Sequence, residues 1–308
     1  MSTDGISQTE RAASVVAIGG GHGLAATLRA LRRMPVEPIA VVSVADDGGS
    51  SGRLRSESDR AAPGDLRKCL LALAGDSGPL GRAMGHRFSH GELAGHSFGN
   101  LLISALESTE GDLLGAIGAV SELLDIRGTV LPATSDVVEL VATLVGGGEV
   151  AGQSAVADTA GIDTVRLEPA AVPGATVPKV ILDADVVVLG PGSLFTSVLA
   201  AAVVEGVPEA IEATSATVVY VCNLFPQAHE TDGYSVADHV DALARHGIRA
   251  DIVLHDRARI GSADGVAGAV AAPLADSTGR AHDPELLAAA LSDVITAHGA
   301  PRGTWRSG

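Results

Sequence analysis

The chain has 308 residues, 46% of them hydrophobic, which is enough for one large domain or two small ones with a sizeable core. Its formal net charge of −16 argues against nonspecific binding to nucleic acid or to anionic membranes. No run reaches about 18 uncharged apolar residues, so no membrane insertion is expected.

The first residues, 1–13, are polar and carry acids, which predicts a disordered tail rather than a signal peptide. A loose tail is predicted for residues 299–308. Cys69 and Cys222 lie far apart and neither belongs to a metal-type or redox-type pair. A reduced, cytoplasmic protein is the simplest interpretation.

The first predicted elements form a βαβ unit. Residues 14–18 are an apolar run that ends in glycines, residues 24–33 have helical spacing, and residues 39–44 are a second buried strand. Such a unit is expected to be parallel and right-handed.

The middle of the chain changes character. Residues 60–145 predict a mainly helical insertion, with helices at 65–74, 98–108 and 113–124. Residues 150–178 contain short β-prone pieces, which predict two small extra strands.

The strand and helix alternation then returns. Strands are predicted at 184–189, 217–222 and 251–254, and helices at 194–205, 235–245 and 284–297. Together with the first unit, these elements predict an α/β fold: a single domain over residues 14–298 with a doubly wound, mostly parallel sheet.

An acidic loop follows the second predicted strand. It contains two adjacent carboxylates, then small residues, then two arginines: Asp46, Asp47, Ser50, Ser51, Arg53 and Arg55. Backbone amides, hydroxyls and acids suit sugar hydroxyls or a metal, and the arginines suit phosphates. The alternative is a solvated turn between a strand and a helix.

Two glycine-rich turns each follow a buried strand and precede a helix. The first contains Gly20, Gly21, His22 and Gly23, and the second contains Gly190, Gly192 and Ser193, with Thr196 in the following helix. A helix N-terminus favours an anion, and by the strand-end rule the two turns should lie side by side across the sheet crevice. For either turn, the alternative is a tight glycine turn with no ligand.

Three further stretches could contribute to a site. Asp65 and Arg67 lie at a predicted helix start, where Asp65 could simply be the N-cap. His96 and Asn100 flank another helix start and could bind a ligand or cap the helix. The third stretch follows a buried strand and contains Asn223 and Thr231.

The aromatic residues Phe98, Phe195, Phe225 and Tyr234 all fall inside these motifs, where they could stack on a ligand ring or only anchor loops. The histidines His86, His90 and His96 lack a cysteine or a carboxylate cluster that would complete a zinc site.

These stretches, in this order, resemble the YvcK/CofD-like family, and its YvcK branch closely. The matching patterns are IGGGxGL, ADDGGSSGRLR, PGDLR, GHSxGNL, GPGSLxTS and NLxxQxxETDGYS, within residues 14–285. Arg280 begins what looks like a variant of that branch's RHD element. The segment Gly152-Gln153-Ser154 stands where the family usually has GES or GET, so an acid is missing there.

The resemblance implies a Rossmann-like fold with a nucleotide-sugar site. Members of the YvcK branch are described as cytoplasmic proteins that bind UDP-N-acetylglucosamine and are linked to cell shape and envelope synthesis during gluconeogenic growth. Members of the CofD branch are metal-dependent transferases that build the tail of the deazaflavin cofactor.

The main hypothesis is therefore a non-catalytic or weakly catalytic UDP-sugar-binding regulator, expected to be a homo-oligomer, with no certain cofactor. The rival is a phosphoryl-type transferase in which Asp46 and Asp47 hold Mg²⁺. A third interpretation is a partner-binding protein with a vestigial pocket.

Overall fold

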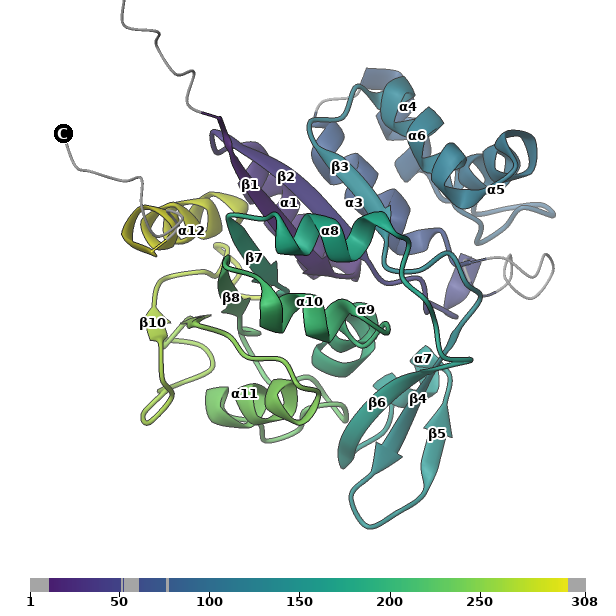
Figure 1. Ribbon diagram of the computed structural model, residues 1–308. Coiled ribbons are helices and arrows are strands. Elements are labelled where there is room, and N and C mark those ends of the chain that lie inside the picture. Colours follow the sequence, from purple (N-terminus) through teal and green to yellow (C-terminus); the bar gives the residue numbers. More distant parts are fainter. Residues whose placement is uncertain (1–10, 51, 53–60, 76–77, 299–308) are drawn as a thin grey trace, which may run out of the picture.

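The protein is described from a computed structural model, in which residues 11–50, 52, 61–75 and 78–298 are placed well enough to describe (Figure 1). A seven-stranded sheet forms its centre, with the strand order β10-β9-β8-β7-β1-β2-β3 and every pair parallel. Its strands are β1 (Ala13–Gly19), β2 (Val36–Val42), β3 (Thr129–Pro132), β7 (Val186–Leu189), β8 (Thr217–Val221), β9 (Ile252–His255) and β10 (Ala269–Ala271).

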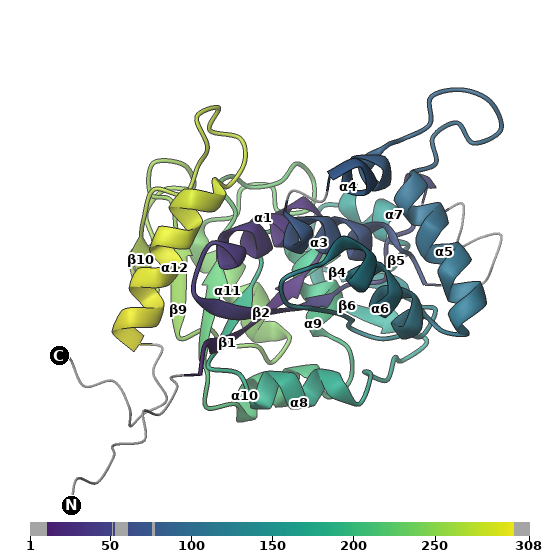
Figure 2. The ribbon, with the colours of Figure 1, turned by 90° about the horizontal axis from the view of Figure 1, so that it is seen from above.

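Helices cover both faces of this sheet, so its central strands are buried on both sides. Figure 2 shows α1 (Gly21–Arg32), α3 (Gly64–Ala74) and α12 (Pro284–His298) over one face and α8 (Thr176–Leu182) and α10 (Val207–Ala213) over the other. In β1 and β7, Val15 to Ile18 and Val186 to Leu189 have no exposed surface, as expected for parallel strands between two helical layers. The predicted Rossmann-like, doubly wound α/β fold is confirmed.

Further helices follow strands β7 and β8. The helix predicted at 194–205 is instead a π-helix, η1 (Leu194–Leu199), that continues into α9 (Ala200–Ala202). Helix α11 (Val236–Arg245) follows β8 as predicted and begins with a capping box formed by Ser235 and Asp238.

The predicted helical insertion is only partly helical. It holds α3, α4 (Gly78–Gly85), α5 (Phe98–Glu110) and α6 (Leu113–Leu124), but β3 also lies within it and pairs with β2 at the edge of the main sheet. A strand of four residues with two buried positions carries too little periodicity to be read from sequence.

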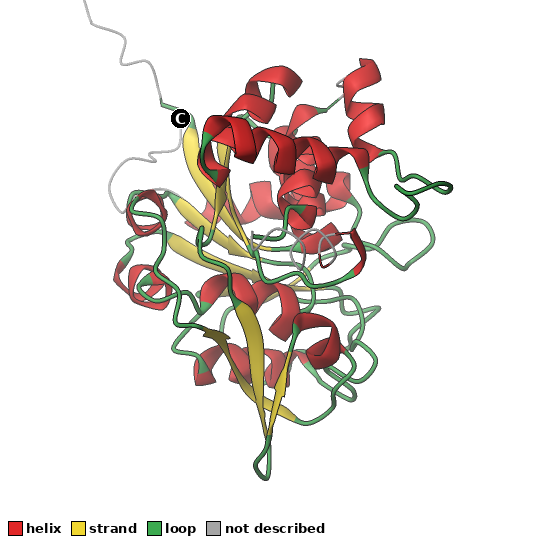
Figure 3. Ribbon diagram, turned by 90° about the vertical axis from the view of Figure 1, so that its right-hand side faces the viewer, coloured by secondary structure: helices red, strands yellow, loops and turns green. Residues whose placement is uncertain are grey.

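A separate antiparallel sheet of three short strands lies beside the main body, at the lower edge of the views in Figures 1 and 3. It is formed by β4 (Glu139–Leu144), β5 (Glu149–Ala151) and β6 (Ile162–Glu168), and α7 (Gln153–Ala157) follows β5. The two predicted extra strands correspond to β5 and β6, whereas β4 was not predicted.

No single helix in the described part of the chain is long and apolar enough to cross a membrane. Two segments, Leu194–Ala202 and Val207–Ala213, meet that length and composition only as a pair bent by 78°.

Candidate functional site

The two glycine-rich turns lie side by side at the switch point of the sheet. Strands β1 and β7 are neighbours, with Ile18 opposite Leu189, and the chain winds outward in opposite directions from them. Crevices at such points are where open α/β sheets bind ligands. The turns touch directly, because a Cβ on Gly23 would lie 2.1 Å from the carbonyl oxygen of Pro191. The predicted convergence is confirmed, and contact between the turns is itself a reason for glycine at this position.

The N-terminus of α1 already holds a carboxylate of this chain. The amide of Gly21 donates to Asp65 Oδ2 over 2.7 Å, and Lys68 Nζ donates to Asp65 Oδ1 over 2.9 Å. Asp65 does not cap its own helix, since the N-cap of α3 is Pro63 and no side chain caps it. Asp65 instead joins the first turn of α1 to α3, and the prediction of a local N-cap is wrong.

The second glycine turn leads into η1, whose N-terminus also holds an internal carboxylate. Glu230 Oε1 accepts from the amides of Phe195 and Thr196 over 2.7 and 3.1 Å, and Thr196 Oγ1 donates to Oε2 over 3.1 Å. Glu230 is buried, with 3% of its surface exposed. Burial raises its pKa, and the hydrogen bonds from Thr196 and Phe195 partly offset that rise.

These two carboxylates change which amides a ligand could use. Gly21, Phe195 and Thr196 donate internally, so a phosphate on those three groups would have to displace a carboxylate. Four amides at the same two helix starts have no acceptor among the described residues: His22, Gly23, Ser193 and Leu194. Leu194 is fully buried, whereas His22, Gly23 and Ser193 keep exposed surface. The amides of these three residues are the anion donors that the crevice keeps available.

The acidic loop reaches the crevice from the end of β2. Asp47 Oδ1 accepts from the amide of Ser154 over 2.9 Å and from its hydroxyl over 2.6 Å, and therefore caps α7. Asp46 Oδ1 accepts from the amide of Gly48 over 3.0 Å. Gln153 Nε2 donates to the carbonyl oxygen of Thr196 over 3.2 Å, which ties this corner to η1. The segment that lacks the family acid thus holds the acidic loop against the second glycine turn.

A buried polar network flanks the same loop. Ser50 Oγ lies 3.3 Å from His96 Nδ1 and accepts from Asn100 Nδ2 over 3.3 Å. Arg67 Nε donates to Asn100 Oδ1 over 2.8 Å, and Arg67 Nη1 donates to the carbonyl oxygen of Met84 over 3.3 Å. Burial lowers the pKa of the Arg67 guanidinium, and the positive charge of Arg87 adds to this effect. Arg67 and Asn100 therefore tie α3, α4 and α5 together beside the loop.

His22, in the first turn of α1, has a shifted pKa although it is not deeply buried. Partial burial lowers the pKa of His22, and the positive charge of Lys68 lowers it further. A neutral imidazole at neutral pH leaves the first turn of α1 without an added charge.

The loop after β8 supports the second glycine turn. Asn223 Oδ1 accepts from the amide of Gly192 over 3.2 Å, and Gln227 Nε2 donates to Ser193 Oγ over 2.8 Å. Thr231 is fully buried, and its Oγ1 accepts from the amide of Gln227 over 2.8 Å. Asn223 and Thr231 thus shape the loop from within.

The last candidate residue, Arg280, lies in a turn in which its amide donates to Asp276 Oδ1 over 3.0 Å. This segment is joined to the end of β8 by His282, whose Nε2 donates to the carbonyl oxygen of Cys222 over 3.2 Å. Burial lowers the pKa of His282 to about 4. Ser51, Arg53 and Arg55 lie outside the described residues.

Sequence reasoning missed Glu230, Gln153 and Ser154 as structural parts of the crevice. Glu230 stood inside a quoted motif, but a single acid in a polar loop carries no sign of the helix that it will cap. Over residues 11–50, 61–75 and 78–298, no group of three or more His, Cys, Asp or Glu side chains could hold a metal ion.

Comparisons with known proteins agree with this architecture. The family model described as 2-phospho-L-lactate transferase CofD matches residues 15–275. A "Gluconeogenesis factor" from Halalkalibacterium halodurans is 44% identical over 251 residues, covering 79% of this chain and 77% of the relative. A crystal structure of a UPF0052-family protein from Bacillus halodurans superposes with a TM-score of 0.87 at 36% identity, covering 92% of this chain and 99% of the other.

A "Putative gluconeogenesis factor" from Deinococcus radiodurans is 42% identical over 310 residues, covering 92% of this chain. The match spans 66% of that relative and 52% of one from Nostoc, so these two proteins extend well beyond the shared region. The family match covers most of the chain and several relatives exceed 40% identity, and the chain therefore belongs to the CofD-like family, among the relatives named as gluconeogenesis factors.

Proposed function

We propose that this protein binds a nucleotide sugar, UDP-N-acetylglucosamine, in the crevice at the carboxyl ends of β1 and β7, and acts in the cytoplasm as a regulator of cell shape and envelope synthesis. The observation that carries the proposal is the pairing of two glycine-rich helix starts. There the amides of His22, Gly23 and Ser193 keep exposed surface and have no acceptor among the described residues. A diphosphate needs several donors at once, and two adjacent helix N-termini supply them with favourable dipoles.

The surrounding groups suit the rest of such a ligand. Asp46 lies in the loop that follows β2, which ends at Val42, and an acid near the end of this strand commonly accepts a hydrogen bond from a ribose hydroxyl. Asp47 has one carboxylate oxygen occupied by Ser154, and Asp46 has one occupied by Gly48, so either acid remains a candidate for that contact. Relatives named as gluconeogenesis factors support a role in the response to carbon source.

The test uses two substitutions at one position. Ser193→Pro removes an amide that has no acceptor in the described part of the chain, and the Ser193 φ of −49° is close to what proline requires. Ser193→Ala removes only the hydroxyl that accepts from Gln227. In calorimetry with UDP-N-acetylglucosamine, we expect Ser193→Ala to keep most of the affinity and Ser193→Pro to lose about tenfold or more.

Two outcomes would contradict the proposal. One is no binding by the unmodified protein at millimolar ligand, and the other is equal affinity of both variants. A cellular role that persists in Ser193→Pro despite lost binding would favour the partner-binding interpretation with a vestigial pocket.

The name of the matching family supports a second candidate, a Mg²⁺-dependent transferase of deazaflavin cofactor synthesis. Asp46 and Asp47 would hold the ion, since Mg²⁺ is often bound by one or two carboxylates together with substrate phosphates. Asp47 could offer only its second oxygen while it caps α7. When bound, Mg²⁺ would supply charge stabilisation during transfer.

The transferase is tested by turnover of the deazaflavin precursor with Mg²⁺. Loss of turnover in Asp47→Asn with retention in Ser154→Ala would favour it, because only the first change removes a charge while both disturb the same cap. No turnover in the unmodified protein would reject it.

A further inference from the structure

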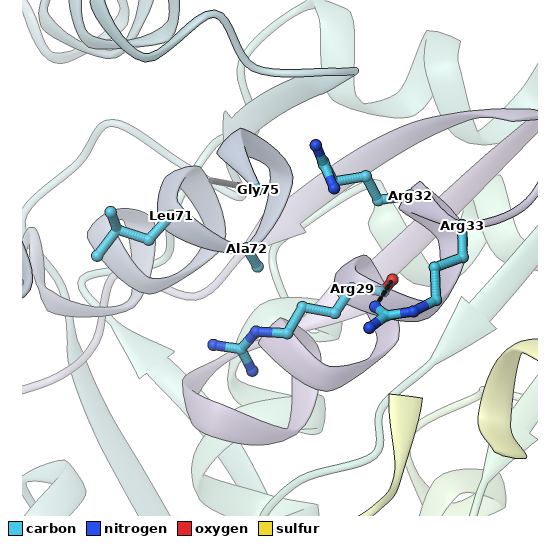
Figure 4. A pocket seen from close by; sticks show the side chains of 6 residues that line it. All are labelled: Arg29, Arg32, Arg33, Leu71, Ala72 and Gly75. Atoms are coloured by element: carbon cyan, nitrogen blue, oxygen red, sulfur yellow. Dashed lines mark hydrogen bonds between the residues drawn. The ribbon is translucent and has the colours of Figure 1, made fainter. Parts of the chain in front are cut away.

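We propose a second anion-binding site, for a small phosphorylated ligand, between the last turns of α1 and α3. A cavity of about 270 Å³ lies there, lined by Arg29, Arg32, Arg33, Leu71, Ala72 and Gly75 (Figure 4). Pockets for drug-sized ligands are typically ~300–1,000 Å³, so this one suits a small metabolite.

The cavity is separate from the crevice. Helix α1 gives its first turn to the crevice and its last turn to the cavity, and Arg29 lies about 12 Å along the helix axis from Gly21. None of the residues that line the cavity belongs to either glycine-rich turn.

Helix carbonyl groups that would repel an anion here are already occupied. Arg32 Nε donates to the carbonyl oxygen of Leu73 over 3.0 Å, and Arg33 Nη1 donates to that of Arg29 over 3.0 Å. Arg127 Nη1 donates to the carbonyl oxygen of Arg32 over 2.7 Å. Each helix C-terminus carries roughly half a negative charge, so four guanidinium groups leave an excess of positive charge at this place.

Little in the described part of the chain neutralises that excess. The one ion pair there joins Arg33 Nη2 to Glu285 Oε1 at 3.9 Å, and both side chains are about half or more exposed. Arg29 has no hydrogen-bond acceptor or ion-pair partner for its guanidinium among the described residues. On a chain with a net charge of −16, three arginines around one cavity form a local attraction for anions.

Glycine at position 75 leaves room for the Arg32 side chain beside the cavity. Gly75 has a φ of +67°, and a Cβ there would lie 2.0 Å from Arg32 Nη2. Stabilisation of the dipole explains why a basic residue lies in the last turn of α1, but Arg127 and Arg32 already meet those helix ends. Arg29 remains to bind a phosphate group, for which the planar guanidinium offers two parallel donors.

The test is an NMR titration of the isotope-labelled full chain with inorganic pyrophosphate. We expect saturable shifts of the Arg29 side-chain Nε and of the amides of Leu71 and Gly75. The variant Arg29→Gln removes a guanidinium that would bind the phosphate, so it should weaken the affinity measured at these signals by about fivefold or more. The Arg29 guanidinium makes no hydrogen bond or ion pair among the described residues, so the fold should not change.

The control variant is Arg257→Gln, which changes an exposed arginine outside the cavity by the same charge. It should leave the titration unchanged. Shifts confined to the amides of His22, Gly23 and Ser193 would overturn the proposal, as would equal affinity in Arg29→Gln and Arg257→Gln. Binding in the crevice and binding in the cavity shift the NMR signals of different residues. Absence of binding in the cavity is therefore distinguishable from absence of binding at the proposed nucleotide-sugar site.

Discussion

The two helix starts of the crevice are capped by internal carboxylates in different electrostatic surroundings. Asp65, at α1, is paired with Lys68 at 2.9 Å, and the side chain of that lysine keeps 24% of its surface exposed. Glu230, at η1, is bound by two amides and one hydroxyl, and no cation pairs with it among the described residues. Both carboxylates are buried, with 5% of Asp65 and 3% of Glu230 exposed. The same role in the fold is therefore met once with a paired lysine and once by neutral donors and a helix dipole alone.

This comparison predicts that Glu230, the carboxylate without a paired cation among the described residues, matters more for stability. In Glu230→Ala, the amides of Phe195 and Thr196 would be left buried without an acceptor. Hydrogen bonds to charged groups contribute about 1.5–3 kcal/mol each, so the free energy of unfolding should fall by about 3 kcal/mol. Denaturant unfolding measures this, with the exposed Asp232→Ala as a control that should change it by less than about 0.5 kcal/mol.

A smaller loss is expected for Asp65→Ala, of about 1–2 kcal/mol in the same measurement. The Gly21 amide loses its acceptor, but the partly exposed Lys68 can turn toward solvent. If Asp65→Ala proves more destabilising than Glu230→Ala, the distinction between the two caps is wrong.

The smallest expected effect is a pH dependence. Burial raises the pKa of Glu230 in the folded protein, so the folded state holds its proton more tightly than the unfolded chain does. The stabilisation that this proton gives is fully present below the ordinary glutamate pKa of about 4.3 and is lost as pH rises through the folded value. Glu230→Gln, which stays neutral, should therefore gain stability relative to the unmodified protein as pH rises through this range. A difference between the two proteins that does not change with pH would contradict the expectation.

Much of the architecture could be predicted from local pattern. The buried runs at β1, β7 and β8 are continuous and apolar, and each ends in glycine or a polar loop, so the parallel sheet and its crevice follow from rules for strand ends. Strands β3 and β4 were missed because only part of each is buried, so neither forms a continuous apolar run like the equally short β7 and β9.

The sequence by itself determined that two glycine turns would meet at the carboxyl ends of neighbouring parallel strands, since strand order and handedness leave few other arrangements. Only the tertiary structure decided which amides of those turns stay free. Asp65 is 44 residues from Gly21, and Glu230 is 35 residues from Phe195, along the chain. No local preference encodes contacts at such separation, because they depend on how helices and loops pack after the sheet has formed.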